Sequence, residues 1–299
     1  MAARRPVELR RTWLFVPGAE RTALLDAPRS GADVLIQELE DFVPPERRQD
    51  ARKLLAPVLA GWRDAGVVAA VRINPLSSDD GAADLEAALR AGAETILLPK
   101  TRDASDVVAL DVAITRWERV LGIAAGSVEL VPNVESAGAL MRTGSIAAAT
   151  PRVVACLVAS EDMAADLGAE RARDALELDY ARQRFLVECV GAGVLAIDCP
   201  YTWSDAEGAV REAEAARRLG YRAKSLVAAG HAAAINAVFT PGAEEIALAQ
   251  RIVAVFEAAR RRGEGGAELD GNLVELPTYL NASRLIARAQ AFAAAARGE

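Results

Sequence analysis

Acidic side chains end two apolar runs in the middle of the chain. Glu135 closes the run 128–135, and Asp162 follows the run 153–160. Two carboxylates held close together raise each other's pKa unless a cation compensates them. Mg²⁺ is a hard cation that binds carboxylate oxygens and keeps several waters. If the two runs are adjacent strands, which lie about 4.8 Å apart, Glu135 and Asp162 are expected to hold one magnesium ion.

Polar residues also end most of the other apolar runs. They include Glu38, Glu40 and Asp41 in the second run and just after it, Arg72 in the third, Lys100 in the fourth, Asn133 in the fifth, Ser160 in the sixth, Asp198 in the seventh and Lys224 in the eighth. The guanidinium of Arg72 is suited to a two-pronged grip on a substrate carboxylate. The alternative for Arg72 is a structural salt bridge with Glu40 or Asp41. Any one of these polar residues taken alone could equally be a helix cap or a solvated loop residue.

The apolar runs indicate how these residues come together. Eight of them have strand length, at 11–17, 32–40, 67–74, 94–100, 128–135, 153–160, 194–200 and 221–229. Segments with helical spacing separate them, such as 45–62, 84–91, 137–149, 175–190 and 205–219. This alternation predicts a parallel sheet, and eight repeats predict an α/β fold closed into a (β/α)8 TIM barrel. In such a barrel all strand C-termini meet on one face.

An open doubly wound sheet is the alternative α/β fold. Its first strand–helix turn would need a glycine-rich phosphate-binding loop, whereas the segment 15–20 contains a single glycine, Gly18. We therefore predict a barrel over 1–240 and a C-terminal helical extension of the same domain over 241–299. Two helical segments, 241–262 and 277–297, flank a Gly/Glu-rich stretch in this extension.

Composition narrows the class of protein. The formal net charge is -7 and the pI is about 5.1. Such a chain is not expected to bind nucleic acid or an anionic membrane, because both attract basic proteins. The single histidine, His231, excludes metal sites built from several histidines of one chain. Three widely spaced cysteines, with no apolar signal region at the N-terminus, predict a cytoplasmic protein.

Six motifs resemble those of citrate lyase β-subunit-like (CitE-like) proteins in the HpcH/HpaI aldolase superfamily. They are RTWLFVPG at 11–18, LEDFVPP at 39–45, VRINP at 71–75, LLPK at 97–100, SEDMAADLG at 160–168 and NAVFTP at 236–241. The resemblance extends over almost the whole chain, as far as Leu280.

The resemblance implies a magnesium-dependent carbon–carbon lyase or aldolase. The implied substrate is a 3-hydroxyacyl-CoA thioester of the citryl-, citramalyl- or malyl-CoA type, which is cleaved or formed through an enolate with a 2-oxo acid as partner. The implied oligomer is a homotrimer or hexamer. The implied site has Glu135 and Asp162 as Mg²⁺ ligands, Arg72, Glu40 and Asp41 as catalytic groups, and Arg72, Lys100, Glu38 and Ser160 as substrate contacts.

The chain also departs from the family pattern. Glu38 stands where the family usually has aspartate, Gly138 where it has arginine, and the Ile-His-Pro after the last strand is replaced by 227–229. Two alternatives therefore stay open: a malyl-CoA-type thioesterase, and a barrel that binds metal and a CoA-type ligand without turnover. His231 is interpreted as a relocated polar group at the mouth or as an exposed residue of the last barrel helix.

Overall fold

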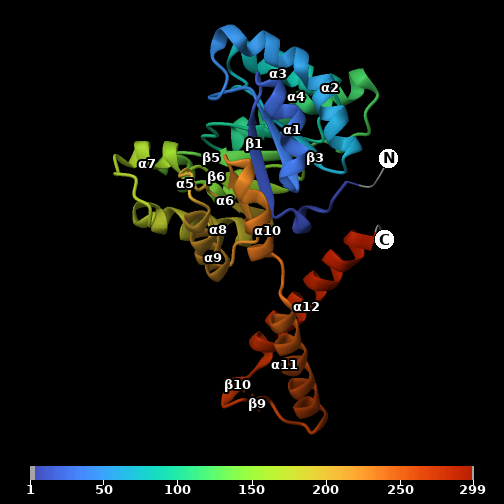
Figure 1. The fold of residues 1–299 in the computed structure, drawn as a ribbon, viewed down its shortest axis with the longest axis vertical. Coiled ribbons are helices and arrows are strands. Elements are labelled where there is room, and N and C mark those ends of the chain that lie inside the picture. The colour runs from blue at the N-terminus through green and yellow to red at the C-terminus, as the bar shows by residue number, and fades with distance from the viewer. Residues whose placement is uncertain (1–3, 298–299) are drawn as a thin grey trace. The chain divides into compact units, whose positions relative to one another are not determined.

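Eight parallel strands close into a barrel (Figure 1). The computed structural model describes residues 4–297, so 1–3 and 298–299 of the predicted domain ranges lie outside the described residues. The strands are β1 (Thr12–Pro17), β2 (Val34–Glu38), β3 (Val68–Arg72), β4 (Thr95–Leu98), β5 (Glu129–Val134), β6 (Ala155–Val158), β7 (Leu195–Asp198) and β8 (Ala223–Leu226). Because β8 pairs back onto β1, the sheet has no free edge. The predicted (β/α)8 TIM barrel is confirmed, and the open sheet is excluded.

Alternate residues along the strands fill the barrel. The inward side chains form one buried cluster of Trp13, Phe15, Val34, Ile36, Val68, Ala70, Leu97, Val131, Ala155, Leu157, Ile197 and Ala223. The residues between them, such as Leu14 and Leu35, are also buried and face the helices by the alternation of a strand. Burial on both faces explains why the strands read as continuous apolar runs.

Helices surround these strands (Figure 1). They are α1 (Arg21–Asp26), α2 (Arg48–Asp64), α3 (Asp79–Arg90), α4 (Ala104–Leu121), α5 (Ala137–Leu140), α6 (Thr143–Ala147), α7 (Glu161–Leu167), α8 (Asp179–Ala192), α9 (Ala206–Leu219) and α10 (Ala232–Phe239). Short 3-10 turns lie at Val7–Leu9, Ala27–Ser30, Pro45–Arg47, Leu176–Leu178 and Ala229–His231. No helix within residues 4–297 combines the length and the apolar character needed to cross a membrane.

Local side-chain chemistry explains where the helix predictions differ from the structure. Helix α3 starts earlier than predicted because the Ser78 side chain caps it, accepting a hydrogen bond from Gly81 N at 3.1 Å. The predicted helix 137–149 is broken into α5 and α6, since Arg142 adopts φ -120° and leaves the helical region.

The chain divides into two compact units between Ala237 and Val238, close to the predicted boundary at 240. The second unit contains α11 (Ala243–Arg261), α12 (Leu276–Arg297) and an antiparallel hairpin of β9 (Ala267–Leu269) and β10 (Asn272–Val274). This hairpin lies within the segment that was predicted only as a Gly/Glu-rich stretch between two helices. Its signal was the dipeptide Asp270–Gly271, whose positive φ angles of 53° and 79° suit a two-residue hairpin turn. That the extension belongs to the same domain as the barrel stays a prediction.

Candidate active site

Strand alternation selects which of the strand-end residues point into the barrel mouth. In β2, β3 and β5 the inward residues include Ile36, Ala70 and Val131. Counting on by twos reaches Glu38, Arg72, Asn133 and then Glu135 on the same inward face. The register places Glu38 directly beside Arg72 on neighbouring strands.

Arg72 lies at the centre of this mouth. Its guanidinium is buried and stacks 4.9 Å from the ring centre of Phe15 and 5.8 Å from that of Phe42. Its Nε donates to Glu38 Oε1 at 2.9 Å, and its Nη2 lies 3.5 Å from Glu40 Oε2. The salt bridge that was considered for Arg72 therefore exists. The third nitrogen, Nη1, takes part in none of these contacts.

Glu38 holds the loop that follows β2. Besides Arg72, its carboxylate accepts hydrogen bonds from Glu40 N at 2.5 Å and Phe42 N at 2.7 Å. The side chain is fully buried. Glu38 therefore positions the Arg72 side chain and the loop that follows β2. The substrate contact that was expected for Glu38 from the sequence is not supported, because Glu38 does not line the cavity described below.

Lys100 clamps the two acidic residues of the same loop. Its Nζ lies 2.5 Å from Glu40 Oε1 and 3.1 Å from Asp41 Oδ1, and its backbone is left-handed, with φ 48°. Burial raises the pKa of Glu40 more than Arg72 and Lys100 lower it. Burial also acts to raise the pKa of Asp41, but the hydrogen bond from Lys100 and the charge of Arg72 outweigh it, so that this pKa is lowered. The two neighbouring carboxyl groups are therefore suited to different protonation states.

Glu135 is buried without a hydrogen-bond partner. Only 5 % of its surface is exposed, and neither carboxylate oxygen is hydrogen-bonded within the described chain. Burial raises the pKa of Glu135 to about 7; the charge of Arg72 and the nearby side chain of Asn133 oppose this, while Asp162 and Glu40 add to it. Neither polar atom of the buried Asn133 is hydrogen-bonded there either. Such orphaned oxygens are costly in a protein interior unless something binds them.

Asn133 and Arg72 border a cavity of about 430 Å³, which we call the mouth cavity, whereas Glu135 lies outside its lining. Its polar lining consists of Asp41, Arg72, Asn133, Ser160, Glu161, Asp162 and Thr202. Its apolar lining consists of Phe15, Phe42, Leu157, Ala159, Pro200 and Val227. Ser160, one of the expected substrate contacts, points its hydroxyl at Pro200 O, 3.4 Å away. Lys100 stands behind Asp41 and outside this lining.

The donor set of the mouth fits a divalent cation. Glu38, Glu40, Asp41, Glu135 and Asp162 are carboxylates, against which only Arg72 and Lys100 supply positive charge among the described residues of this cluster. Glu135 and Asp162 are the two that these cations do not pair. Carboxylate and amide oxygens are the ligands that Mg²⁺ prefers, and Asn133 adds an amide oxygen beside Glu135.

Asp198 and Lys224 do not belong to the mouth, contrary to the sequence analysis. Their strand neighbours Ile197 and Ala223 point into the barrel, so both residues face the helices. There Lys224 Nζ lies 2.7 Å from Asp198 and 2.6 Å from Glu212 of α9, while Arg182 of α8 binds Asp198 with two nitrogens at 2.8 Å.

The acidic residues of this buried cluster are spaced like metal ligands, but Lys224 and Arg182 already neutralise them. Ligand atoms of Asp198, Cys199 and Glu212 lie within 4.8 Å of one another. The Lys224 ammonium already contacts both carboxylates and also donates to Cys199 O at 2.5 Å. A cation is thus in place, and we assign the cluster a structural role.

The two remaining departures from the family pattern have local explanations. His231 is buried, with Nε2 3.3 Å from Ser204 O and its ring 6.2 Å from that of Tyr201, so it is neither exposed nor part of the mouth lining. At Gly138, Arg142 donates from Nη1 to the glycine carbonyl at 2.8 Å. A guanidinium therefore lies at this position although residue 138 has no side chain.

Thr202 and Val227 line the mouth cavity but were missed from sequence. Thr202 lies in a loop without any pattern, where its hydroxyl donates to Glu161 at 2.8 Å. Val227 follows β8 as one more apolar residue of a long apolar run. Phe15 had a usable signal, since it shares the inward alternation of Trp13.

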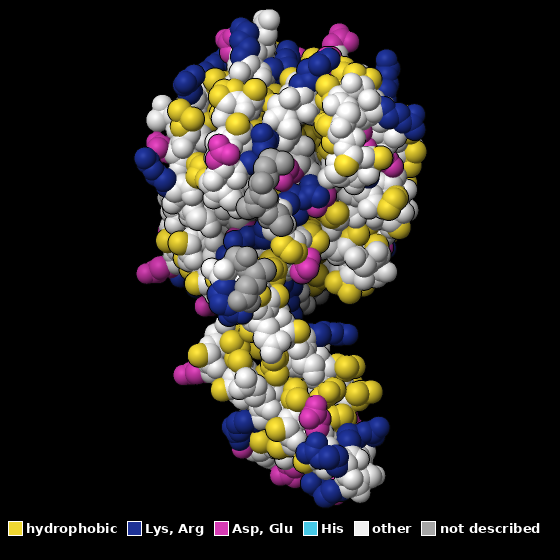
Figure 2. All heavy atoms as spheres, turned by 90° about the vertical axis from the view of Figure 1, so that its right-hand side faces the viewer, with side chains coloured by type: hydrophobic (Ala, Val, Ile, Leu, Met, Phe, Trp, Pro, Cys, Tyr) yellow, Lys and Arg dark blue, Asp and Glu magenta, His cyan; other side chains and the backbone are white. Residues whose placement is uncertain are grey.

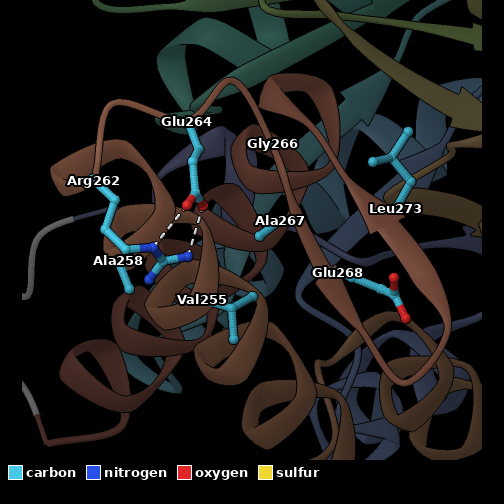
Figure 3. Close-up of a pocket in the computed structure, with 8 residues that line it drawn as sticks. All are labelled: Val255, Ala258, Arg262, Glu264, Gly266, Ala267, Glu268 and Leu273. Carbon is cyan, nitrogen blue, oxygen red and sulfur yellow. Dashed lines mark hydrogen bonds and ion pairs between the residues drawn. The ribbon is translucent and has the colours of Figure 1, made fainter.

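A second cavity, of about 560 Å³, lies within the C-terminal unit (Figure 3). Val255, Ala258, Ala267 and Leu273 form its apolar side. Arg262 and Glu264 at its edge bind each other through two contacts of 2.9 and 2.7 Å (Figure 3). Glu268 also lines it, and all three charged side chains are exposed, so the described lining of this cavity contains no buried, unpartnered carboxylate like that of Glu135.

The chain is similar in sequence to known proteins over the region that forms the mouth cavity. A model of the HpcH/HpaI aldolase/citrate lyase family matches residues 11–229, which include every residue assigned above to the mouth. Citrate lyase subunit beta of Haemophilus influenzae is 32 % identical over 285 residues, covering 95 % of this chain and 98 % of that protein.

Two further relatives carry other information. A (3S)-malyl-CoA thioesterase of Cereibacter sphaeroides is 32 % identical over 285 residues, covering 95 % of this chain and 96 % of that protein. The crystal structure of CitE from Mycobacterium tuberculosis, in complex with magnesium, acetoacetate and coenzyme A, is 27 % identical. It superposes with a TM-score of 0.74 and covers 94 % of this chain and 98 % of that one.

Proposed function

Because the chain belongs to the HpcH/HpaI aldolase/citrate lyase family, we propose that it is a magnesium-dependent carbon–carbon lyase. Its substrate is a 3-hydroxyacyl-CoA thioester of the citryl-, citramalyl- or malyl-CoA type, from which it releases a 2-oxo acid or onto which it condenses one. The observation that carries this proposal is the buried Glu135, without a hydrogen-bond partner and close to Asp162 and Arg72.

Glu135 and Asp162 would hold the metal ion, with Asn133 beside them. When bound there, Mg²⁺ supplies Lewis-acid polarisation of the oxygens of the 2-oxo acid. The magnesium, acetoacetate and coenzyme A in the M. tuberculosis CitE structure support both the metal and the CoA thioester.

Arg72 orients the substrate. Glu38 fixes its Nε, and Phe15 and Phe42 fix the plane of the guanidinium. Nη1, the nitrogen that takes part in none of these contacts, would donate hydrogen bonds to the substrate carboxylate or carbonyl oxygen and so orient the substrate. Burial of Arg72 excludes the water that would compete for these bonds.

Asp41 is our candidate for the group that accepts the hydroxyl proton. Of the three carboxylates Glu38, Glu40 and Asp41, it is the one that lines the mouth cavity. Its lowered pKa keeps it ionised at neutral pH. Removal of the hydroxyl proton turns the carbinol into a carbonyl, the carbon–carbon bond breaks, and the electron pair becomes the enolate of the thioester, which then takes up a proton.

A thioesterase is the second candidate, favoured by the similarity to the (3S)-malyl-CoA thioesterase. Here an activated water attacks the thioester carbonyl and releases free CoA thiol. The two reactions differ in their products, because only the lyase reaction yields a 2-oxo acid together with an intact shorter thioester.

The deciding experiment is an assay of the purified chain with Mg²⁺ on citramalyl-, malyl- and citryl-CoA. Release of 2-oxo acid is followed separately from release of free thiol. We expect 2-oxo acid without thiol, and loss of the activity when a chelator removes the metal. Thiol without 2-oxo acid would establish the thioesterase instead, and neither product would favour a binding protein.

The metal site has its own test. Glu135→Gln and Asp162→Asn are expected to abolish the rise in thermal midpoint that Mg²⁺ gives the wild type, because each variant removes one of the two negative charges that attract the cation, and an amide oxygen binds Mg²⁺ more weakly than a carboxylate oxygen. Glu86→Gln, on the exposed face of α3, is the control and should retain the rise. Wild-type magnesium responses in both site variants would show that the ion binds elsewhere.

A further inference from the structure

Asp166 belongs to the motif at 160–168 but lies outside the lining of the mouth cavity. Its carboxylate reaches the loop after β5, where Oδ2 accepts a hydrogen bond from Ala137 N at 2.7 Å. We infer that Asp166 is a positioning residue, which sets the spacing of Glu135 and Asp162 and thereby the selectivity of the metal site for Mg²⁺ over Ca²⁺. This inference rests on the proposed function, which makes those two residues the metal ligands.

The hydrogen bond belongs to the first turn of α5, which follows Glu135 closely in the chain. The first backbone N–H groups of a helix have no partner within the helix. Ser136, the N-cap residue, accepts a hydrogen bond from Ala139 N at 3.2 Å and does not serve Ala137 N. Asp166 supplies the missing acceptor from another helix. Its carboxylate is thereby attached two residues from Glu135 along the chain.

The other end of this link lies on the helix that carries Asp162. Asp162 and Asp166 are four residues apart in α7, so both lie on the same face of the helix. Four residues make about one helical turn. A hydrogen bond that holds Asp166 against Ala137 therefore also limits how far Asp162 can move away from Glu135.

The strand ladder ends before it reaches the metal ligands. Its last pair between β5 and β6 is formed by Val134 and Val158, and both ligands follow this point in the chain. Among the described residues, the bond accepted by Asp166 is the one hydrogen bond between the segments 135–142 and 160–168. The ladder thus fixes where the two loops begin, and Asp166 fixes their separation further on.

The two ions differ in how much they depend on this separation. Mg²⁺ needs a nearly ideal octahedron of oxygens at about 2.0–2.1 Å, whereas Ca²⁺ accepts about six to eight oxygens at about 2.3–2.6 Å in flexible arrangements. Loops that can drift apart should therefore cost Mg²⁺ affinity more than Ca²⁺ affinity. A link that holds them together favours the smaller ion.

Two substitutions separate the position of the Asp166 acceptor from its charge. Asp166→Asn keeps an oxygen acceptor in place and removes the charge, while Asp166→Glu keeps the charge and moves the acceptor by one methylene. Titration calorimetry of the metal-free protein with Mg²⁺ and with Ca²⁺, without substrate, gives both affinities. We expect Asp166→Glu to raise the Kd for Mg²⁺ about tenfold and that for Ca²⁺ less. Asp166→Asn should keep both close to the wild type, because the charge of this exposed residue is screened.

Asp103→Ala is the matched control for a purely structural effect. Asp103 caps α4 by accepting a hydrogen bond from Ser105 N at 2.8 Å, after a strand that carries neither metal ligand. Asp103→Ala and Asp166→Ala should both lower the thermal midpoint, because each removes a partner of a helix N-terminus. Only Asp166→Ala should also lower the ratio of Mg²⁺ to Ca²⁺ affinity.

The outcomes separate this inference from the proposed function. An unchanged affinity ratio in Asp166→Glu overturns the inference and leaves the proposed metal site intact. Equal losses in Asp166→Asn and Asp166→Glu overturn it as well, because charge and not position would then be responsible. No Mg²⁺ binding by the wild type overturns the proposed metal site and this inference with it.

Discussion

At the scale of single residues, the site is a balance between buried charges and the cations that neutralise them. Arg72 and Lys100 compensate Glu38, Glu40 and Asp41, and the neighbouring Glu135 is left without a partner. Burial of the unpartnered Glu135 carboxylate costs free energy, and a bound cation would remove this cost. This residue is therefore where the metal-free protein should be most sensitive to pH.

Glu135 should make the metal-free protein less stable as pH rises. Its pKa is about 7 in the folded chain, against 4.5 for the ordinary side chain. The folded state thus holds a proton that the unfolded state has lost, so the free energy of unfolding falls between pH 4.5 and 7, by about 3 kcal/mol.

Urea unfolding at pH 5 and pH 8 in the presence of chelator measures this effect. Glu135→Gln removes the titrating group, so its stability should change less over this interval than that of the wild type. An identical pH dependence of wild type and variant would contradict the raised pKa. Added Mg²⁺ should restore most of the wild-type loss at pH 8.

The closeness of Glu135 and Asp162 was predictable at this scale because it needs only a carboxylate at the end of each of two adjacent strands. The role of Glu38 was not, since its contacts with Glu40 N and Phe42 N depend on how the following loop turns back. The same holds for Lys100, whose left-handed backbone directs it onto Glu40 and Asp41. Loop conformation of this kind leaves no periodic pattern in a sequence.

At the scale of elements, the approach of β1 to β2 sets the position of the site. Gly18, just after β1, lies so close to β2 that a Cβ atom there would stand 2.1 Å from Glu38 O and 2.9 Å from Leu39 Cδ2. The carbonyl that would be displaced belongs to the residue that anchors Arg72. Only glycine fits at position 18, because any side chain there would clash with the backbone of β2.

Gly18→Ala should lower both stability and activity. The clash is with backbone, which cannot move aside cheaply, so we expect a loss of about 3 kcal/mol in the free energy of unfolding and a fall in kcat/KM as Glu38 shifts. Gly61→Ala in α2 is the control, because nothing lies within 4 Å of its Cβ. The control should gain about 0.5–1 kcal/mol. Equal urea midpoints for the two variants would refute the argument.

The helices α8 and α9 are joined to the barrel by buried charges. Lys224 binds Asp198 and Glu212, and all three side chains are buried. Lys224→Met leaves Glu212 without this cation and should cost about 3–5 kcal/mol in unfolding free energy. Lys53→Met, which breaks an exposed pair with Asp50, should leave it close to the wild-type value. A small effect at Lys224 would mean that water reaches the cluster.

Strand positions were predictable from apolar runs, but the face on which each strand-end residue lies needed one further step. Arg72 and Glu135 share the alternation of the inward residues, whereas Asp198 and Lys224 fall on the opposite alternation. Counting by twos along each strand would have separated the two sets from the sequence alone. The same count succeeds just past β8, where it leads from Ala223 to Val227 in the lining of the mouth cavity.

At the scale of the whole molecule, hydrophobic side chains remain exposed on the C-terminal unit. Figure 2 shows hydrophobic side chains on the face of the C-terminal unit that is turned to the viewer. Leu248, Leu273, Leu276 and Leu280 are exposed there. Exposed apolar surface of this kind is common at subunit contacts.

We predict that the chain forms a homotrimer or hexamer, as its family resemblance implies. Light scattering coupled to gel filtration should give three or six times the 31.6 kDa of one chain. Replacing Leu273 and Leu276 together by Ser should shift the mass toward that of one chain, while Val112→Ser on α4 should not. A wild-type mass of one chain at micromolar concentration would refute the prediction.

The buried Lys224 has a consequence for covalent labelling. The chain has three lysines, Lys53, Lys100 and Lys224, with side-chain exposures of 65, 48 and 0 %. An acylating reagent can therefore reach the exposed amine of Lys53. The amine of Lys100 is held by two carboxylates, and that of Lys224 is buried between the sheet and the helices. Peptide mass spectrometry over one time course would measure the acylation rate of each lysine. Lys53 would report on the surface, Lys100 on the site, and Lys224 on the opening of the layer formed by α8 and α9.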